Sequence, residues 1–104
     1  MISIWITKEK KHIRIRMNGH AGFAEPGQDI VCAGASMLFY TLAEAEGNAA
    51  ELISIRAGGD SEIVFRDTRK SRTRLGMFRD GAGLLIRNYP ECVRWGENPP
   101  GAAI

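Results

Sequence analysis

Residues 30–46 read IVCAGASMLFYTLAEAE and are followed by Gly47 and Asn48. This dense apolar run contains no proline and is too long for a strand, so it predicts an α-helix. Gly47 and Asn48 occupy positions at which helices commonly end. At the other end, Asp29 is the expected N-cap, with its carboxylate accepting hydrogen bonds from the backbone N–H groups of Val31 or Cys32. The segments on either side of this helix have a different periodicity.

Before the helix, apolar and polar side chains alternate with a period of two. The alternation covers residues 2–7 and again residues 12–18, with the charged residues 8–11 between them. One face of each segment is apolar, namely Ile2, Ile4, Ile6, Ile13, Ile15 and Met17. The pattern predicts an antiparallel hairpin with one buried and one solvated face. His12 falls on the solvated face, and the alternation alone explains its presence.

After the helix, the same two patterns recur in the same order. Alternation over residues 53–57 and 62–66, with Gly58-Gly59-Asp60 as the turn, predicts a second hairpin. From Ser71 onward apolar side chains recur at helical spacing, namely Leu75, Phe78, Ala82, Leu85, Ile86 and Tyr89. Three glycines weaken this second helix, by up to ~1 kcal/mol each relative to alanine. We therefore expect packing on the sheet to hold it, or the glycines to permit close contact with another element.

The order β-β-α-β-β-α predicts an α+β fold of two layers, a four-stranded antiparallel sheet covered by two helices. A length of 104 residues fits one domain. We assign residues 1–97 to that domain and expect residues 98–104, which include Pro99 and Pro100, to form a loose tail. Pro90 marks the expected end of the second helix.

The composition, 44% hydrophobic and 25% charged, is that of an ordinary globular protein. No apolar run approaches the ~20 residues that span a bilayer, and the first residues alternate instead of forming a signal-peptide core. We therefore expect a cytoplasmic protein without a membrane partner, in which Cys32 and Cys92 stay reduced. Cys92 is interpreted as a small buried apolar group. The net charge of +2 is too small to predict a nucleic-acid partner.

Residues 19–36, GHAGFAEPGQDIVCAGAS, place His20 and Cys32 at the two ends of one glycine-rich loop. A cysteine attacks carbonyl carbon as its thiolate, which a helix N-terminus favours by ~0.3 to 1 kcal/mol. That is less than the ~1.36 kcal/mol of one pKa unit, so a base is also needed. His20 is the candidate, first as base toward the thiol and then as acid toward the leaving amine. The pair is typical of acyl-transfer chemistry.

The same motif resembles the Prp family of bacterial ribosomal-processing cysteine proteases, also called YsxB-like. The resemblance implies that His20 and Cys32 are the catalytic pair, because the matching residues have that role in the family. It also implies the two-layer fold and a homodimer. The implied substrate is the twenty-seventh protein of the large ribosomal subunit, whose short N-terminal extension must be removed.

Four further residues are candidates for supporting the reaction. Asp29 either caps the helix or orients His20, and its position favours the cap. The backbone N–H groups of Cys32 and Ala33 are expected to be free at the helix start, as donors to an oxyanion. Gly34 would let substrate approach closely. Ser36, one turn after Cys32, either bonds to substrate or the loop or bonds back to its own backbone.

The loop itself is expected to adapt to a substrate. Gly19, Gly22 and Gly27 make it flexible, and Phe23 is either a lid residue over an apolar peptide or an anchor to the core. A zinc site from His20, Asp29 and Cys32 is set aside, because structural zinc takes four ligands in close pairs. We expect no metal or other cofactor.

Two alternatives remain to a protease that processes this ribosomal protein. The arginine-rich segment of residues 66–74 could make the chain a non-catalytic module that binds ribosomal RNA or an acidic protein face. The chain could also be a divergent or prophage-borne protease that acts on another protein.

Overall fold

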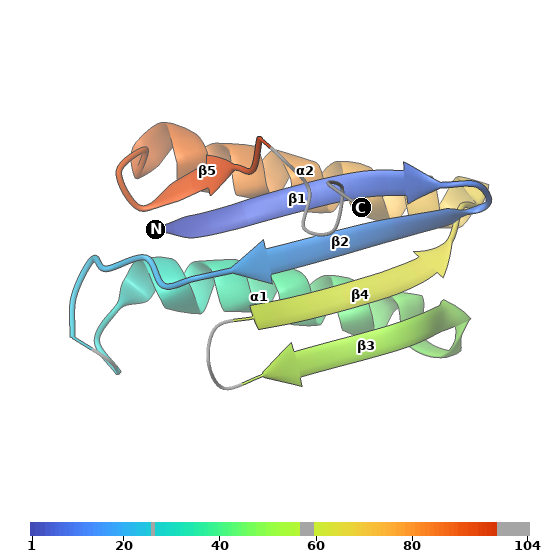
Figure 1. The fold of residues 1–104 in the computed structure, drawn as a ribbon, viewed down its shortest axis with the longest axis horizontal. Helices are drawn as coiled ribbons and strands as arrows, with labels where there is room; N and C mark the ends of the chain where they lie inside the picture. Colours follow the sequence, from blue (N-terminus) through green and yellow to red (C-terminus); the bar gives the residue numbers. More distant parts are fainter. Residues whose placement is uncertain (26, 57–59, 98–104) are drawn as a thin grey trace.

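The structure, a computed structural model, describes residues 1–25, 27–56 and 60–97. Figure 1 shows a single sheet with two helices behind it. In chain order the elements are β1 (Ile2–Glu9), β2 (His12–Asn18), α1 (Ile30–Glu46), the short 3-10 helix η1 (Gly47–Ala49), β3 (Ala50–Arg56), β4 (Asp60–Arg66), α2 (Arg69–Asn88) and β5 (Val93–Trp95). The predicted α+β class and the predicted order of two hairpins and two helices are therefore confirmed.

The sheet has five strands in the order β3-β4-β2-β1-β5. The first four pair antiparallel, whereas β5 pairs parallel to β1, with Ile2 opposite Val93 and Ile4 opposite Trp95. The prediction of a four-stranded, wholly antiparallel sheet was therefore wrong. With only three residues, β5 is too short to show a period of its own. Its pairing depends on the turn after α2, which brings the chain back beside β1.

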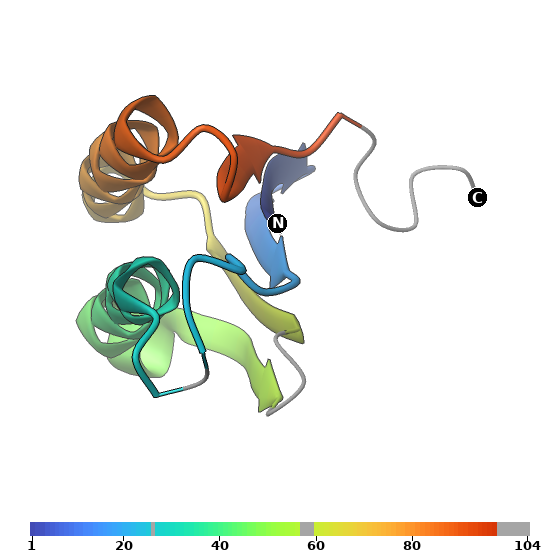
Figure 2. The same cartoon turned by 90° about the vertical axis from the view of Figure 1, so that its left-hand side faces the viewer.

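Both helices lie on one face of the sheet, and the core fills the space between the layers (Figure 2). The inward faces predicted for the first hairpin are confirmed, since Ile2, Ile4, Ile13, Ile15 and Met17 are all buried. Ile6 is only partly buried but packs against the same core. In the second hairpin Ile63 and Phe65 are buried, while Ile53 is 45% exposed because β3 is an edge strand.

Each helix begins at a capping side chain. Asp29 caps α1 as predicted, and Gly47 ends that helix with a φ of 53° and its N–H bonded to the Ala43 carbonyl. The second helix begins at Arg69, two residues before the predicted start, because the hydroxyl of Thr68 accepts a hydrogen bond from the N–H of Ser71. It ends at Asn88, shortly before Pro90.

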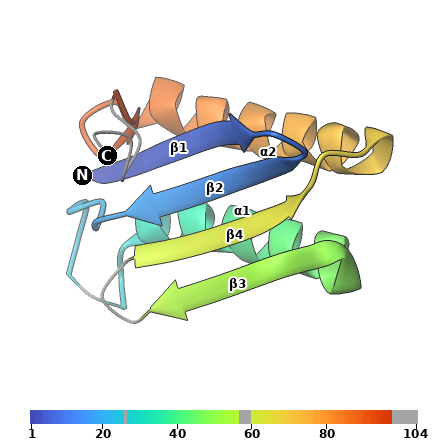
Figure 3. The same cartoon turned by 45° about the vertical axis from the view of Figure 1, so that its right-hand side comes forward.

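The two helices run antiparallel (Figure 3) and approach closely at Gly81. A Cβ at this position would overlap the terminal methyl groups of Leu38, so a larger residue would require the Leu38 side chain to move. Toward the other end of the pair, the buried carboxylate of Glu46 accepts hydrogen bonds from Ser71 (3.0 Å) and Arg74 (3.2 Å). The expectation that helix glycines permit a close contact is confirmed at this one position.

Two predictions concern residues that lie outside the described part of the chain. They are the turn at Gly58-Gly59 and the tail of residues 98–104. Of the two helices that the structure describes, neither is long and apolar enough to cross a membrane.

Candidate active site

The loop between β2 and α1 borders a cavity of about 560 Å³ at one end of the sheet. The residues lining it are His20, Gly22, Ala24, Gly27, Asp29, Cys32, Ala33 and Ser36. His20 comes from the end of the loop next to β2, and Cys32 from the first turn of α1. The loop is thus folded so that both residues line one cavity, with His20 exposed and Cys32 half-buried.

The sulfur of Cys32 receives a hydrogen bond from the main chain. The N–H of Ala21, the residue after His20, donates to its Sγ at 3.2 Å. The same sulfur lies in the first turn of α1, where the helix dipole favours negative charge. Both features place positive partial charge at the sulfur. The Ala21 donor was not predicted, because a residue's identity does not indicate where its N–H points.

Asp29 holds both the helix start and the loop. Its Oδ1 accepts from the N–H groups of Val31 (3.0 Å) and Cys32 (2.9 Å). Its Oδ2 accepts from those of Phe23 (2.9 Å) and Ala24 (3.4 Å). The Cys32 N–H is the main cause that lowers the pKa of Asp29, against a smaller opposing effect of burial, and the other three N–H groups add to the lowering.

The predicted cap is therefore confirmed, and the cap also ties down the loop. Among the hydrogen bonds of the described residues, none joins Asp29 to His20. The contacts of this carboxylate are with backbone N–H groups instead.

The prediction that Cys32 and Ala33 offer free N–H groups was wrong. The Cys32 N–H donates to Oδ1 of Asp29, and the Ala33 N–H donates to the Asp29 carbonyl at 3.1 Å. An N-cap residue binds the first donors of its helix with both its side chain and its carbonyl. Donors for an oxyanion must therefore come from elsewhere in the cavity. The hydroxyl of Ser36 lines it and forms none of the hydrogen bonds found among the described residues.

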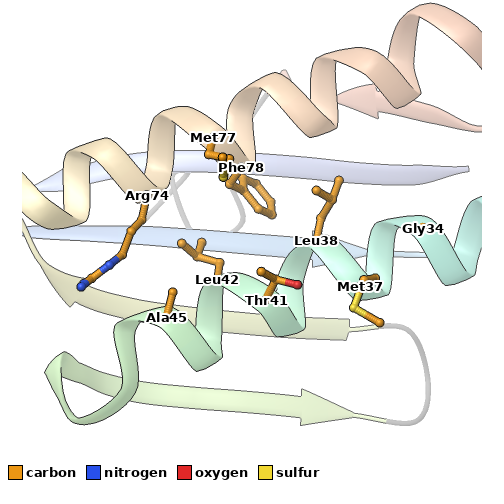
Figure 4. A pocket seen from close by; sticks show the side chains of 9 residues that line it. All are labelled: Gly34, Met37, Leu38, Thr41, Leu42, Ala45, Arg74, Met77 and Phe78. Atoms are coloured by element: carbon orange, nitrogen blue, oxygen red, sulfur yellow. The ribbon is translucent and has the colours of Figure 1, made fainter.

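Gly34 does not line this cavity. It lies on another side of α1, where a Cβ would approach Leu85 of α2 at 3.6 Å. There it borders an apolar groove of about 320 Å³ between the helices, which Figure 4 shows with Met37, Leu38 and Phe78. This position corrects the prediction that Gly34 admits substrate beside Cys32. Two residues along a helix correspond to about 200° of rotation, so the two positions face different ways.

The loop has backbone conformations that favour glycine. Gly19, Gly22 and Gly27 have φ values of 99°, 69° and 87°. A Cβ at Gly19 would also overlap the backbone carbonyl of Met1. Phe23 is 48% exposed, and its ring contacts that of Tyr89 edge to face, with centroids 5.5 Å apart. In this structure Phe23 anchors the loop to the residue that ends α2.

Among the described residues that line the cavity, Asp29 supplies a carboxylate and none is a lysine or arginine. Within residues 1–25, 27–56 and 60–97, no three His, Cys, Asp or Glu side chains gather in a way that could hold a metal ion. The chemistry that these residues offer is that of a cysteine and a histidine beside a hollow open to solvent.

Comparisons with known proteins agree with this chemistry. A family model described as cysteine protease Prp matches residues 1–92. No match was found among curated proteins. The ribosomal processing protease Prp from S. aureus, crystallised with a covalently linked product peptide, is 26% identical over 92% of this chain and 98% of its own, with a TM-score of 0.80. The protein SMU.848 from Streptococcus mutans is 28% identical over 91% of both chains, with a TM-score of 0.68.

Proposed function

Because the chain belongs to the family of cysteine protease Prp, and is itself a cysteine protease, we propose that Cys32 is its nucleophile and His20 its general base. We further propose that it removes the short N-terminal extension of the twenty-seventh protein of the large ribosomal subunit. A cytoplasmic homodimer is part of the same proposal and rests on the family resemblance.

One observation carries the assignment of the nucleophile. Cys32 places its sulfur at the start of α1, within reach of the Ala21 N–H, and in the same cavity as His20. The other cysteine, Cys92, lies in the turn after α2, and its carbonyl accepts a hydrogen bond from Ile2. The other histidine, His12, lies on β2 and pairs with Glu51 at 2.8 Å. Neither of these two residues borders the cavity.

The reaction follows from these positions. His20 takes the proton from Sγ of Cys32, and the thiolate attacks the carbonyl carbon of the scissile peptide bond. His20 then gives the proton to the departing amine nitrogen as the carbon–nitrogen bond breaks, which leaves a thioester on Cys32. Water loses a proton to His20 and attacks the thioester. The new carboxyl end departs, and the thiol regains its proton.

Two observations support a ribosomal protein as the substrate. The S. aureus protein that resembles this chain is described as a ribosomal processing protease and was crystallised with peptides. Ribosomal proteins are generally basic, and the described residues that line the cavity include one carboxylate and no lysine or arginine. The positive net charge of the whole chain therefore does not oppose a basic segment at this site.

The first experiment is mass spectrometry of the full-length ribosomal protein after incubation with the enzyme. We expect one N-terminal cut with the wild type and none with Cys32→Ala or His20→Ala. The matched controls are Cys92→Ala and His12→Ala, which remove the other cysteine and the other histidine and should cut normally. If Cys92→Ala abolished cleavage as Cys32→Ala does, or His12→Ala as His20→Ala does, the assigned catalytic pair would be contradicted.

A second measurement tests the reactivity of Cys32 independently of the identity of the substrate. Alkylation near neutral pH should modify Cys32 faster than Cys92, because Cys32 shares an open cavity with His20, whereas Cys92 lies in the turn after α2. Fast alkylation of Cys32 without any cut in the ribosomal protein would reject this substrate and indicate another target protein.

A further inference from the structure

The basic residues of this chain are distributed unevenly. Seven of the fourteen lysine and arginine residues, including all four lysines, occur in residues 8–11 and 66–72. The first segment is the end of β1 with the turn to β2, and the second runs from the last residue of β4 into the first turn of α2. Figure 1 places both segments at the end of the molecule opposite the loop that contains His20. A main-chain hydrogen bond from Asp67 to the Lys11 carbonyl, 2.8 Å long, joins the two segments.

Five of these cations are exposed and form no ion pair within the described part of the chain. We call them the basic end: Lys10, Lys11, Arg66, Arg69 and Lys70. The two carboxylates in the same segments already have partners. Asp67 pairs with Lys8 and Arg72, each at 2.8 Å, and Glu9 pairs with Arg14 at 3.3 Å. The positive charge of the basic end is therefore not neutralised by neighbouring side chains.

The chemistry of the basic end fits a phosphate backbone better than a protein surface. None of the large hydrophobic side chains that are exposed in the described structure lies in either segment. The centre of a protein interface is rich in aromatic and apolar groups and poor in lysine. Lysine and arginine can bind phosphates without any apolar group nearby. The start of α2 adds the positive end of a helix dipole.

We propose that the basic end binds the phosphate backbone of RNA without sequence preference, while the cavity at the opposite end remains free. Residues 8–11 and 66–72 contain no aromatic side chain to stack on bases, so the proposed contact is to phosphates. The choice of RNA over other polyphosphates rests on the proposed function, because a ribosomal protein is found with RNA. The binding itself does not depend on whether the cavity cleaves that protein.

The test is fluorescence anisotropy of a labelled RNA hairpin of arbitrary sequence, titrated with the full chain at several KCl concentrations. Sequence-independent contacts of this kind give a Kd of about 10⁻⁴ to 10⁻⁶ M near physiological salt. With about five phosphates neutralised, the slope of log K against log salt should be about −4. Absence of binding at low salt would overturn the proposal.

A matched pair of double variants localises the contact. Lys11→Glu with Arg69→Glu changes the basic end, and should weaken binding at least about tenfold and reduce the salt slope by about two. Arg79→Glu with Arg87→Glu makes the same change of charge on exposed residues farther along α2, and should leave the affinity and slope unchanged. Equal weakening in both variants would reject a localised site.

Two further readouts complete the design. Thermal unfolding should show both double variants folded, and Arg69→Glu places a carboxylate in the first turn of α2, where a helix tolerates it well. Polyglutamate serves as the competitor that represents an acidic protein face. If polyglutamate displaced the RNA when its carboxylate concentration equals the phosphate concentration, the basic end would be assigned to acidic proteins and the proposal would be overturned.

Discussion

The two halves of the chain each consist of two antiparallel strands followed by a helix, but their strand-to-helix connections differ. Between β4 and α2 the connection is Asp67 and Thr68 alone, whereas residues 19–29 join β2 to α1. Both connections end in a residue whose side chain caps the following helix. The same structural unit thus occurs once with a minimal connection and once with a long one.

The two caps have different consequences. The Thr68 hydroxyl has one acceptor oxygen, which binds the Ser71 N–H, and Ser71 in turn binds the buried Glu46. The Asp29 carboxylate has two oxygens, so it caps α1 with one and holds the loop with the other. A single side chain thus joins the middle of the long connection to the start of α1. The Thr68 cap makes no such contact within the short connection and joins it to α2 alone.

Among variants that test this difference between the two connections, Asp29→Asn is expected to have the largest effect, a loss of activity. The amide keeps one acceptor oxygen for the helix start, and asparagine is as good an N-cap as aspartate. Its nitrogen cannot accept from the N–H groups of Phe23 and Ala24, so the loop is released. We expect kcat/KM to fall about 10²-fold, the effect of misplacing reacting groups by about 1 Å, and the loss of stability to be smaller than that of Asp29→Ala.

Steady-state cleavage of a peptide substrate and urea unfolding measure the two quantities. The comparison variant is Asp29→Ala, which loses both oxygens and should also lose about 1 kcal/mol of stability. If Asp29→Asn cleaves as fast as the wild type, the second oxygen has no role in positioning the site.

The next effect concerns two glycines, one in each half. Gly19→Ala should destabilise the chain by about 2 kcal/mol or more, because its φ is positive and the new Cβ would overlap the Met1 carbonyl. Gly76→Ala in α2 meets open space and should stabilise by up to about 1 kcal/mol. Chemical denaturation of both variants gives the values. Equal signs for the two substitutions would show that backbone strain in the long connection is not what requires glycine.

A smaller effect is expected at the short connection. Thr68→Ala removes the cap of α2 and should cost about 1 kcal/mol of unfolding free energy. Thr68→Ser keeps an acceptor hydroxyl and is the matched control, with most of the stability retained. Peptide cleavage well below the unfolding temperature should stay at the wild-type rate in both variants. A drop in cleavage with Thr68→Ala would mean that the two connections are coupled through the helices.

The sequence was sufficient to predict most of the fold, because period-two and helical patterns are local. Strand β5 could not be predicted in the same way, since Val93, Arg94 and Trp95 are too few to show alternation. The predicted start of α2 at Ser71 was two residues late, because apolar spacing does not mark a helix start, whereas the N-cap Thr68 does. The partners of a short strand are set by the path of the whole chain.

The candidate site was predictable in part. The sequence order indicated His20, Cys32 and the cap Asp29, but the direction of the Ala21 N–H depends on the folded loop. Two predictions about the site were wrong. The predicted cap named the N–H of Val31 or of Cys32 as the donor to Asp29, and in the structure both donate to it, which leaves the Cys32 N–H unavailable for an oxyanion. Helical geometry also places Gly34 away from Cys32.

The smallest expected effects are those of acid and salt on the two aspartates. Lys8 first and then Arg72 lower the pKa of Asp67, whereas backbone N–H groups lower that of Asp29. Because each pKa lies below its unfolded value near 3.9, each carboxylate stabilises the fold above that pH. This contribution is lost as the pH falls through the folded pKa. Asp29→Asn and Asp67→Asn should each make the decline of unfolding free energy below about pH 4 shallower.

Salt distinguishes the two aspartates, because it screens ion pairs between side chains much more than hydrogen bonds to the backbone. In about 1 M KCl, where the Debye length is about 3 Å, the difference between wild type and Asp67→Asn should shrink. The difference between wild type and Asp29→Asn should persist. Urea unfolding at a series of pH values, at low and high salt, measures both. If salt reduced the two differences equally, the long connection would be held by charge, and the contrast between the two caps would fail.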